Sequence, residues 1–556
     1  MLSADEVAKL VSEVTERVIM RVGSPSDDPA AGPPRTLGET LDETLWWEQE
    51  RLREQDPNDE ETLADKQFYA DLHRQLQHAN ALEQRRLLQQ IVHRYTHEIA
   101  GNFSPTVYKL AAKVAPPMLS ALLTGLSPRR LFGREAIPRL DQHVIIEGEV
   151  DNLERLRERG TLVVTPTHSS NLDSLLIGFA VHELGLPPLT YGAGLSLFRN
   201  PIVGKFMHNL GAYTVDRRKR DPLYKQTLKA FASVSLEFGQ DNLFFPGGSR
   251  SRSGAIERGL KKGLLGCSVS AYRNNLMRGK PNPDIYVVPC TISYPLVLEA
   301  STLIEDWLAE VGKSRYIIVD DEFSRWERWL DFLRGMFALD LKIHIRFGRA
   351  MDPFGNPVDA AGTSLDPKGR PISARGYFEV DGEVVEDPAR DAEYTRELER
   401  RILAEFSRQN VIHPTHVLAF ACFELLRRAQ PEFDLYRLLS SIGAGRSEQS
   451  LALPEVEEEI ELLLEELERR FAAGQIRLSS VVTEAITNDD VAVLLRAALR
   501  SFGTYHPKPV VERRGVRLHV CDAKLLFYYR NRLDGYALRD APALASFTGP
   551  GGARHV

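Results

Sequence analysis

Short runs of apolar, β-branched residues alternate with longer helical stretches between about residues 140 and 350. Strands that alternate with helices are typical of a sheet whose strands are joined by helical crossovers. We therefore expect an α/β domain with a central mixed sheet flanked by helices. The candidate strands are 144–146, 162–164, 242–245, 285–292 and 341–347, and the candidate helices between them are 172–184 and 222–239.

The sequence on both sides of this domain has a helical pattern. Residues 1–22 place apolar side chains on one face, and residues 454–470 form an acidic amphipathic pattern. Asp381-Gly382 lies between two short alternating runs, which indicates a hairpin. The predicted divisions are a helical N-terminal region (1–135) with a linker at 24–35, the α/β domain (140–350), a Pro/Gly-rich segment with the hairpin (351–387), a helical C-terminal region (388–543) and a tail (544–556).

The composition is that of a folded protein with one strongly basic segment. Of 556 residues, 43% are apolar and 26% are charged, which excludes a wholly disordered or disulfide-stapled chain. The formal net charge is −7, yet residues 191–280 carry 16 Lys and Arg against 5 Asp and Glu. Such an excess favours anionic ligands or lipid headgroups, whereas the acidic balance of the whole chain argues against nucleic acid.

The sequence does not predict export or a membrane span. Asp5 and Glu6 stand where a signal peptide would carry basic residues and then an apolar core. No stretch of about 18 uncharged apolar residues occurs. The four cysteines are far apart and form no Cys-x-x-Cys pair, which favours reduced thiols in a cytoplasm.

His168 and Asp173 stand five residues apart, directly after a candidate strand. An aspartate can hold an imidazole in one tautomer and stabilise the imidazolium formed on proton uptake. Residues at this spacing face different sides of a continuous helix, so we expect His168 in a loop, a residue of 169–171 as N-cap and Asp173 in the first turn. The alternative is structural, with His168 as an ordinary loop residue and Asp173 as a charge at a helix start.

An apolar strand runs into a glycine turn at 244–254. Gly247 and Gly248 allow the backbone to approach a ligand closely, and Arg250 and Arg252 supply guanidinium groups that match phosphate oxygens. The alternative is a tight surface turn with solvated arginines. Two further segments complete the set: 211–218, which includes Arg217, and 287–294, which by itself is typical of a core strand.

The order and spacing of these segments resemble the four sequence blocks of the glycerolipid acyltransferases. The blocks are His-x4-Asp, Gly-x-x-x-(Ile/Val)-x-Arg, Phe-Pro-Glu-Gly-Thr-Arg-Ser and Val-Pro-x-x-Ile-x-Tyr, and here they fall at 168–173, 211–217, 245–251 and 288–294. Residues 221–225, 253–254 together with 262–265, and 528–533 further resemble the long bacterial glycerol-3-phosphate acyltransferases. One position departs from the family pattern, because the glutamate of the third block is Gly247 here. Glu257, ten residues further on, is a candidate replacement.

The resemblance implies a role for each residue of the site. His168 is expected to be the general base that deprotonates the acceptor hydroxyl, with Asp173 orienting it. Arg217, Arg250 and Arg252 are expected to hold the acceptor phosphate, helped by Gly248 and Ser249. No metal and no cofactor are implied, and acyl-CoA or acyl carrier protein serves as co-substrate.

The implied function is the transfer of a fatty acyl group from a thioester to the sn-1 hydroxyl of glycerol 3-phosphate. The alternatives are a lysophosphatidate or dihydroxyacetone-phosphate acyltransferase, or a weakly active lipid-binding homologue, because of Gly247. The apolar run at 114–126 and the aromatic stretch at 324–339 suggest peripheral attachment to a membrane surface. The expected location is the cytoplasmic face of the inner membrane.

Overall fold

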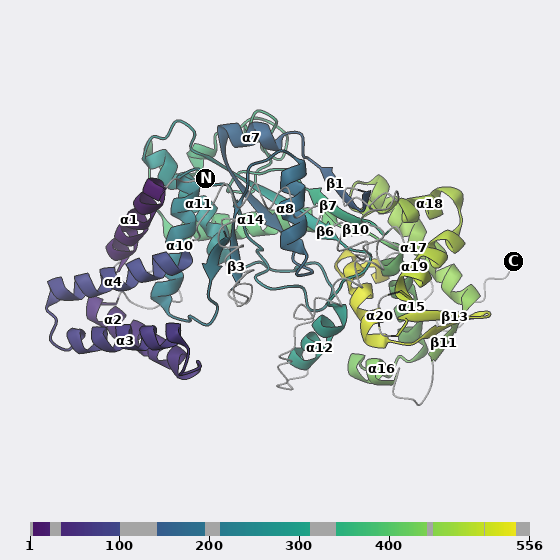
Figure 1. Ribbon diagram of the computed structural model, residues 1–556. Coiled ribbons are helices and arrows are strands. Elements are labelled where there is room, and N and C mark those ends of the chain that lie inside the picture. The colour runs from purple at the N-terminus through teal and green to yellow at the C-terminus, as the bar shows by residue number, and fades with distance from the viewer. Residues whose placement is uncertain are drawn as a thin grey trace, which may run out of the picture.

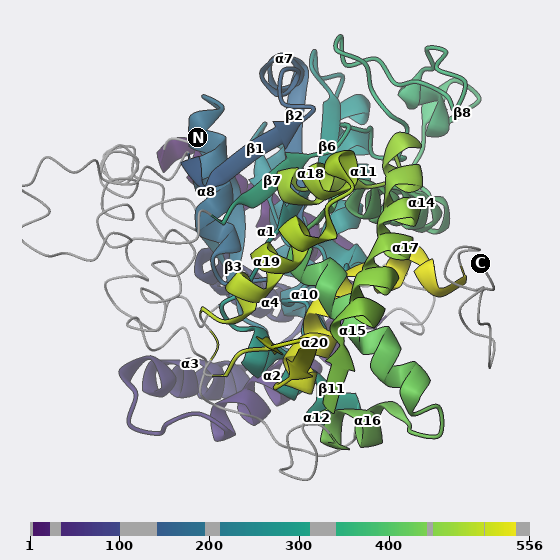
Figure 2. The ribbon, with the colours of Figure 1, turned by 90° about the vertical axis from the view of Figure 1, so that its right-hand side faces the viewer.

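The computed structural model describes residues 4–22, 35–100, 142–194, 212–311, 341–441 and 449–540, apart from residues 505 and 507. A seven-stranded mixed sheet with helices packed around it confirms the expected α/β class. Figures 1 and 2 show N-terminal and C-terminal helices on different sides of the sheet domain. The apolar runs at 114–126 and 324–339, the tail and all but the last residue of the linker lie outside the described residues.

The central sheet has the strand order β1-β7-β6-β2-β5-β3-β4. All neighbouring strands are parallel except β6 and β7, which are antiparallel. The carboxyl ends of β6, β2, β5, β3 and β4 therefore lie along one edge. The strands are β1 (Val144–Gly148), β2 (Gly160–Pro166), β3 (Thr190–Gly194), β4 (Ala212–Val215), β5 (Asn242–Leu243), β6 (Asp284–Ser293) and β7 (Ile343–Phe347).

The middle strands are the most apolar because both faces of the sheet are covered. Nearly every residue of β2 and β6 is buried, as expected for parallel strands beneath helices on both faces. Helix α7 packs against β2, and α11 and α14 (Pro388–Gln409) pack against β6. The helices of this domain are α7 (Leu153–Arg159), α8 (Asp173–Glu183), α10 (Pro222–Glu237), α11 (Lys262–Met277) and α12 (Ala300–Val311).

The N-terminal helices share a second hydrophobic cluster with α10. The predicted apolar face of residues 1–22 is confirmed, since Leu10, Val14 and Val18 of α1 are buried there. Asp221, which caps α10, accepts a hydrogen bond from the hydroxyl of Tyr95 at 3.0 Å. This buried contact ties the N-terminal helices to the segment that follows β4. The helices are α1 (Ala4–Arg21), α2 (Leu37–Arg53), α3 (Glu60–Leu76) and α4 (Ala81–Ile99).

The hairpin and the acidic helix are where the sequence predicts them. Strands β8 and β9 pair antiparallel around Asp381 (φ 52°) and Gly382 (φ 86°), the left-handed pair that a two-residue hairpin turn requires. Helix α17 buries the predicted stripe, which includes Ile460, Leu463 and Leu467. The elements of this part are β8 (Glu379–Val380), β9 (Glu383–Val384), α14 (Pro388–Gln409), α15 (Pro414–Ala429), α16 (Leu435–Ser441), α17 (Leu453–Ala472), α18 (Ser480–Asn488), α19 (Val491–Phe502) and α20 (Ala523–Arg530).

The C-terminal region is not wholly helical, which corrects the expectation for 388–543. It also contains a three-stranded sheet in the order β11-β14-β13 and a two-stranded pair, β10 with β12. These strands are two to four residues long, too short for an alternating pattern to stand out in the sequence. They are β10 (Val411–Ile412), β11 (Gln449–Ala452), β12 (Arg477–Leu478), β13 (Val511–Arg514) and β14 (Arg517–Val520).

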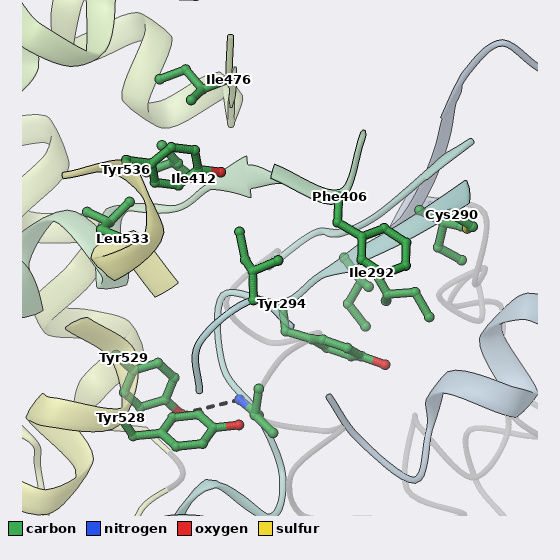
Figure 3. Close-up of a cluster of buried hydrophobic side chains, with 14 of the residues drawn as sticks. Cys290, Ile292, Tyr294, Phe406, Ile412, Ile476, Tyr528, Tyr529, Leu533 and Tyr536 are labelled. Atoms are coloured by element: carbon green, nitrogen blue, oxygen red, sulfur yellow. Dashed lines mark hydrogen bonds between the residues drawn. The ribbon is translucent and has the colours of Figure 1, made fainter. Parts of the chain in front are cut away.

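The end of α20 and the residues after it return to the central sheet. The hydroxyl of Tyr529 accepts a hydrogen bond from the amide of Val297 at 3.2 Å, as Figure 3 shows. Arg532 donates to the carbonyl of Ile292 in β6 at 3.0 Å, and Asn531 donates to the carbonyl of Ser253 at 3.0 Å. Residues 528–533 therefore cover the loops at the carboxyl edge of the sheet. Figure 3 also shows the buried side chains that continue from β6 into this segment.

Candidate active site

The four sequence segments meet at one edge of the sheet. The loop with His168 follows β2, Arg217 follows β4, and Tyr294 follows β6. The fourth loop follows β5 and comprises residues 244–254; we call it the arginine loop. These strands run in the same direction, so their carboxyl ends lie along one edge of the sheet, where open α/β sheets bind their ligands.

His168 and Asp173 form a hydrogen-bonded pair. The imidazole Nδ1 lies 2.8 Å from the Asp173 carboxylate, and Asp173 is completely buried. The same carboxylate accepts the backbone amides of Ser169 at 2.7 Å and Ser170 at 2.9 Å, and the hydroxyl of Tyr294 donates to its other oxygen. Four donors therefore fix the carboxylate. Since Nδ1 faces Asp173, Nε2 is the nitrogen left to exchange a proton with a ligand.

The backbone around this pair differs in one detail from the prediction. His168 lies in a loop and α8 begins at Asp173, but the N-cap residue is Leu172, not one of residues 169–171. The Asp173 carboxylate instead accepts amides of the loop before the helix, those of Ser169 and Ser170. The Ser170 hydroxyl donates to Glu299 at 2.8 Å and accepts the amide of Leu172, the N-cap residue, at 3.2 Å.

The arginine loop and Glu257, which follows it, hold the backbone of His168 on both sides. The amide of Ser251 donates to the His168 carbonyl at 2.7 Å, and the His168 amide donates to Glu257 at 2.7 Å. The imidazole stacks on Phe245 with the ring centroids 4.1 Å apart. The side chain of His168 keeps 16% of its surface exposed, so a ligand can reach the ring.

Two arginines bring positive charge to this edge. Arg250 lies 3.3 Å from the carboxylate of Glu299, which is almost fully buried. Burial raises the pKa of the Glu299 carboxyl, and the charge of Arg250 opposes that shift. Desolvation and the positive charge of Arg250 both lower the pKa of the Arg217 guanidinium. The guanidinium groups of Arg217 and Arg250 are therefore close enough to influence each other's charge. A bound phosphate would neutralise this positive charge.

The other predicted ligand residues lie around the same loop. Arg252 forms an ion pair with Glu310 of α12 at 2.9 Å. Gly248 has a φ of 76° and donates its amide to the Phe245 carbonyl, so its amide is used within the turn. Ser249 and Arg252 border a cavity of about 640 Å³ between the arginine loop and the C-terminal helices, with Trp307, Phe423 and Phe527 in its wall.

Tyr294 and Glu299 are functional candidates that sequence reasoning left out. Tyr294 lies in the fourth segment, which by itself looked like a core strand. Glu299 joins three parts of the site, since it accepts from the Asn171 amide, the Ser170 hydroxyl and Arg250. A single acidic residue at the end of an apolar run was the available signal, because carboxylates are rarely buried unless they are paired.

The domain that carries these residues is similar to a known protein family. Residues 147–293 match the family model described as Acyltransferase, and this range contains His168, Asp173, Arg217 and the arginine loop. This part of the chain is therefore similar to acyltransferase domains.

The curated relatives of this chain are named as one kind of acyltransferase. Proteins named glycerol-3-phosphate acyltransferase are 29% identical over 215 residues in Aeromonas hydrophila subsp. hydrophila and 26% identical over 215 residues in Xanthomonas axonopodis pv. citri. A third from Pseudomonas fluorescens strain Pf0-1 is 23% identical over 347 residues. The matches cover 38%, 38% and 62% of this chain but 24%, 21% and 36% of the relatives. The resemblance to glycerol-3-phosphate acyltransferases is thus confirmed, and the chain spans between about a fifth and about a third of the length of these relatives.

Among the described residues, no helix is both long enough and apolar enough to cross a membrane.

Proposed function

We propose that this protein transfers a fatty acyl group from acyl-CoA or acyl carrier protein to the sn-1 hydroxyl of glycerol 3-phosphate. One observation carries the proposal: the His168–Asp173 pair lies at the same sheet edge as Arg217 and Arg250. A base beside a cationic site suits an acceptor that carries both a hydroxyl and a phosphate. The names of the curated relatives support this choice of acceptor.

In the proposed reaction, His168 Nε2 removes the proton of the acceptor hydroxyl. The hydroxyl oxygen attacks the thioester carbonyl, the carbon–sulfur bond breaks, and the imidazolium returns the proton to the leaving thiolate. Asp173 stabilises the imidazolium between these two steps. Ser169 and Ser170 are buried and Ser170 donates to Glu299, so neither is placed as a covalent acyl carrier. The thioester is already activated, and the proposed reaction therefore uses no metal and no cofactor.

The purified protein tests this proposal directly. Thiol release from palmitoyl-CoA or palmitoyl-acyl carrier protein is followed with glycerol 3-phosphate, lysophosphatidate, dihydroxyacetone phosphate or no acceptor. We expect release that depends on glycerol 3-phosphate and a product acylated at sn-1. Release with lysophosphatidate or dihydroxyacetone phosphate alone would replace the proposed acceptor. No release with any acceptor would favour a lipid-binding homologue.

We further propose peripheral attachment at the cytoplasmic face of the inner membrane. The excess of basic residues at 191–280 supports attraction to anionic headgroups. Flotation with vesicles of phosphatidylglycerol and phosphatidylethanolamine is expected to carry the protein upward at low salt. Equal flotation with pure phosphatidylcholine vesicles would contradict an electrostatic contribution.

Arg250→Ala is expected to raise the KM for glycerol 3-phosphate by about 10- to 100-fold, because hydrogen bonds to charged groups each contribute about 1.5–3 kcal/mol. Arg250→Lys keeps the charge, so its KM should lie between that of the unaltered protein and that of Arg250→Ala. Steady-state kinetics with saturating acyl donor measure the effect. Arg400→Ala, an exposed arginine on α14, is the control. An unchanged KM in Arg250→Ala would contradict phosphate binding by this residue.

A further inference from the structure

Gly247 and Glu257 occupy adjoining space in and after the arginine loop. A Cβ atom added to Gly247 would lie 3.2 Å from Cγ and 3.5 Å from Oε1 of Glu257. A carbon–carbon contact of 3.2 Å is tighter than most contacts of a Cβ atom, so the Glu257 side chain would have to shift by a few tenths of an ångström. Residue 247 is therefore a glycine in a place where any side chain competes with that of Glu257.

The carboxylate of Glu257 is buried, and within the described part of the chain only one of its two oxygens accepts a hydrogen bond. Its Oε1 accepts the amide of His168 at 2.7 Å, whereas its Oε2 is buried and has no hydrogen-bond partner among the described residues. Burial raises the pKa of this carboxyl. An unsatisfied buried polar atom costs about 1–3 kcal/mol, so the residue is an unfavourable choice if stability alone is considered. Such groups are found preferentially where function requires them.

The Glu257 contact acts on the residue that the mechanism uses as its base. His168 is fixed at three points: its ring by Asp173, its carbonyl by Ser251 and its amide by Glu257. Without the Glu257 carboxylate, the backbone amide of His168 loses its acceptor, and the peptide group that precedes His168 can rotate. A displacement of about 1 Å at a catalytic group can cost about 100-fold in rate.

We propose that Glu257 is a positioning residue for His168 and that Gly247 is required as a glycine in order to admit it. This inference rests on the proposed function, because it assigns Glu257 to the base of that reaction. It also means that residue 247 lies close enough to deliver a carboxylate into the same space if Glu257 is removed.

The test is a set of variants at the two positions. Glu257→Ala is expected to lower kcat by about 10- to 100-fold, while the KM for glycerol 3-phosphate changes by less than about 3-fold. Glu257→Gln should keep most of the activity, because its amide oxygen can accept the His168 amide. Gly247→Ala should lower kcat when Glu257 is present but add little in the Glu257→Ala background.

Rescue is the decisive measurement. The double variant Gly247→Glu/Glu257→Ala is expected to recover at least about 10-fold in kcat over Glu257→Ala alone. Gly259→Ala is the matched control, since the nearest atom to its added Cβ is an oxygen of Glu399 at 4.0 Å. A folded double variant that recovers nothing would overturn the proposal. So would a Glu257→Ala protein that melts at a lower temperature but keeps its kcat, because Glu257 would then have only a structural role.

A spectroscopic readout separates this proposal from the proposed function. With 15N-labelled histidine, the His168 amide resonance can be assigned by its loss in His168→Ala. Glu257→Ala is expected to shift this resonance, and Gly259→Ala should leave it in place. An unmoved resonance would overturn the positioning role whether or not the protein releases thiol from any thioester. If the resonance shifts but the protein has no transferase activity, the contact between Glu257 and the His168 amide is supported and the proposed reaction is contradicted.

Discussion

His168→Ala is expected to lower kcat by about 10²- to 10⁴-fold, because that is the usual contribution of a general base. The change removes Nε2, the nitrogen that Asp173 leaves available, and it leaves the carboxylate held by two backbone amides and the Tyr294 hydroxyl. Thiol release at saturating glycerol 3-phosphate and acyl-CoA measures the loss.

The control for this prediction is His182→Ala. His182 is exposed in the last turn of α8 and lies on the same helix that Asp173 begins. The circular dichroism spectrum and the melting temperature should match those of the unaltered protein in both variants. A His168→Ala protein that retains more than about a tenth of the activity would refute the assignment of the base.

Asp173→Asn is expected to reduce kcat by as much as about 10⁴-fold, the size of loss known when an amide replaces the aspartate of a catalytic triad. An amide cannot stabilise the imidazolium by charge. It also places an NH2 group among partners that all donate to the carboxylate. The rate of thiol release and the product yield measure the change.

Tyr294→Phe provides the comparison for Asp173→Asn. It removes one donor to the Asp173 carboxylate but keeps the imidazole contact at 2.8 Å. We expect a loss below about tenfold in this variant. Equal losses in the two variants would indicate that the hydroxyl of Tyr294 has a role of its own in the reaction.

The sequence predicts five strands of the central sheet but misses β3 and β4, which lie together at one side of it. Strands β2 and β6 are continuous apolar runs, because both their faces are covered by helices. Strands β3 and β4 were not predicted: β3 is Thr-Tyr-Gly-Ala-Gly, with little β-branched character, and both are only four or five residues long. Strand pairing far along the chain determines such segments more than their own composition does.

In the candidate site, too, the sequence predicts some contacts and not others. His168 and Asp173 are five residues apart, so a local pattern was sufficient to pair them. Tyr294 approaches Asp173 across 121 residues, Glu299 approaches Ser170 across 129, and Glu257 approaches His168 across 89. No local pattern encodes contacts at these separations. The fold creates them by bringing the ends of separate strands to one edge.

The return of the chain after α20 limits how far the acyltransferase unit can be exchanged between proteins. Gly254 has a φ of 82°, and a Cβ there would come within 2.2 Å of the Tyr528 carbonyl, so the arginine loop is shaped against this distant segment. Asn531 and Arg532 complete that fit from the same side. A chimera that transplants residues 147–293 alone would leave these surfaces uncovered. The sheet domain must therefore be grafted together with α20 and the residues that follow it.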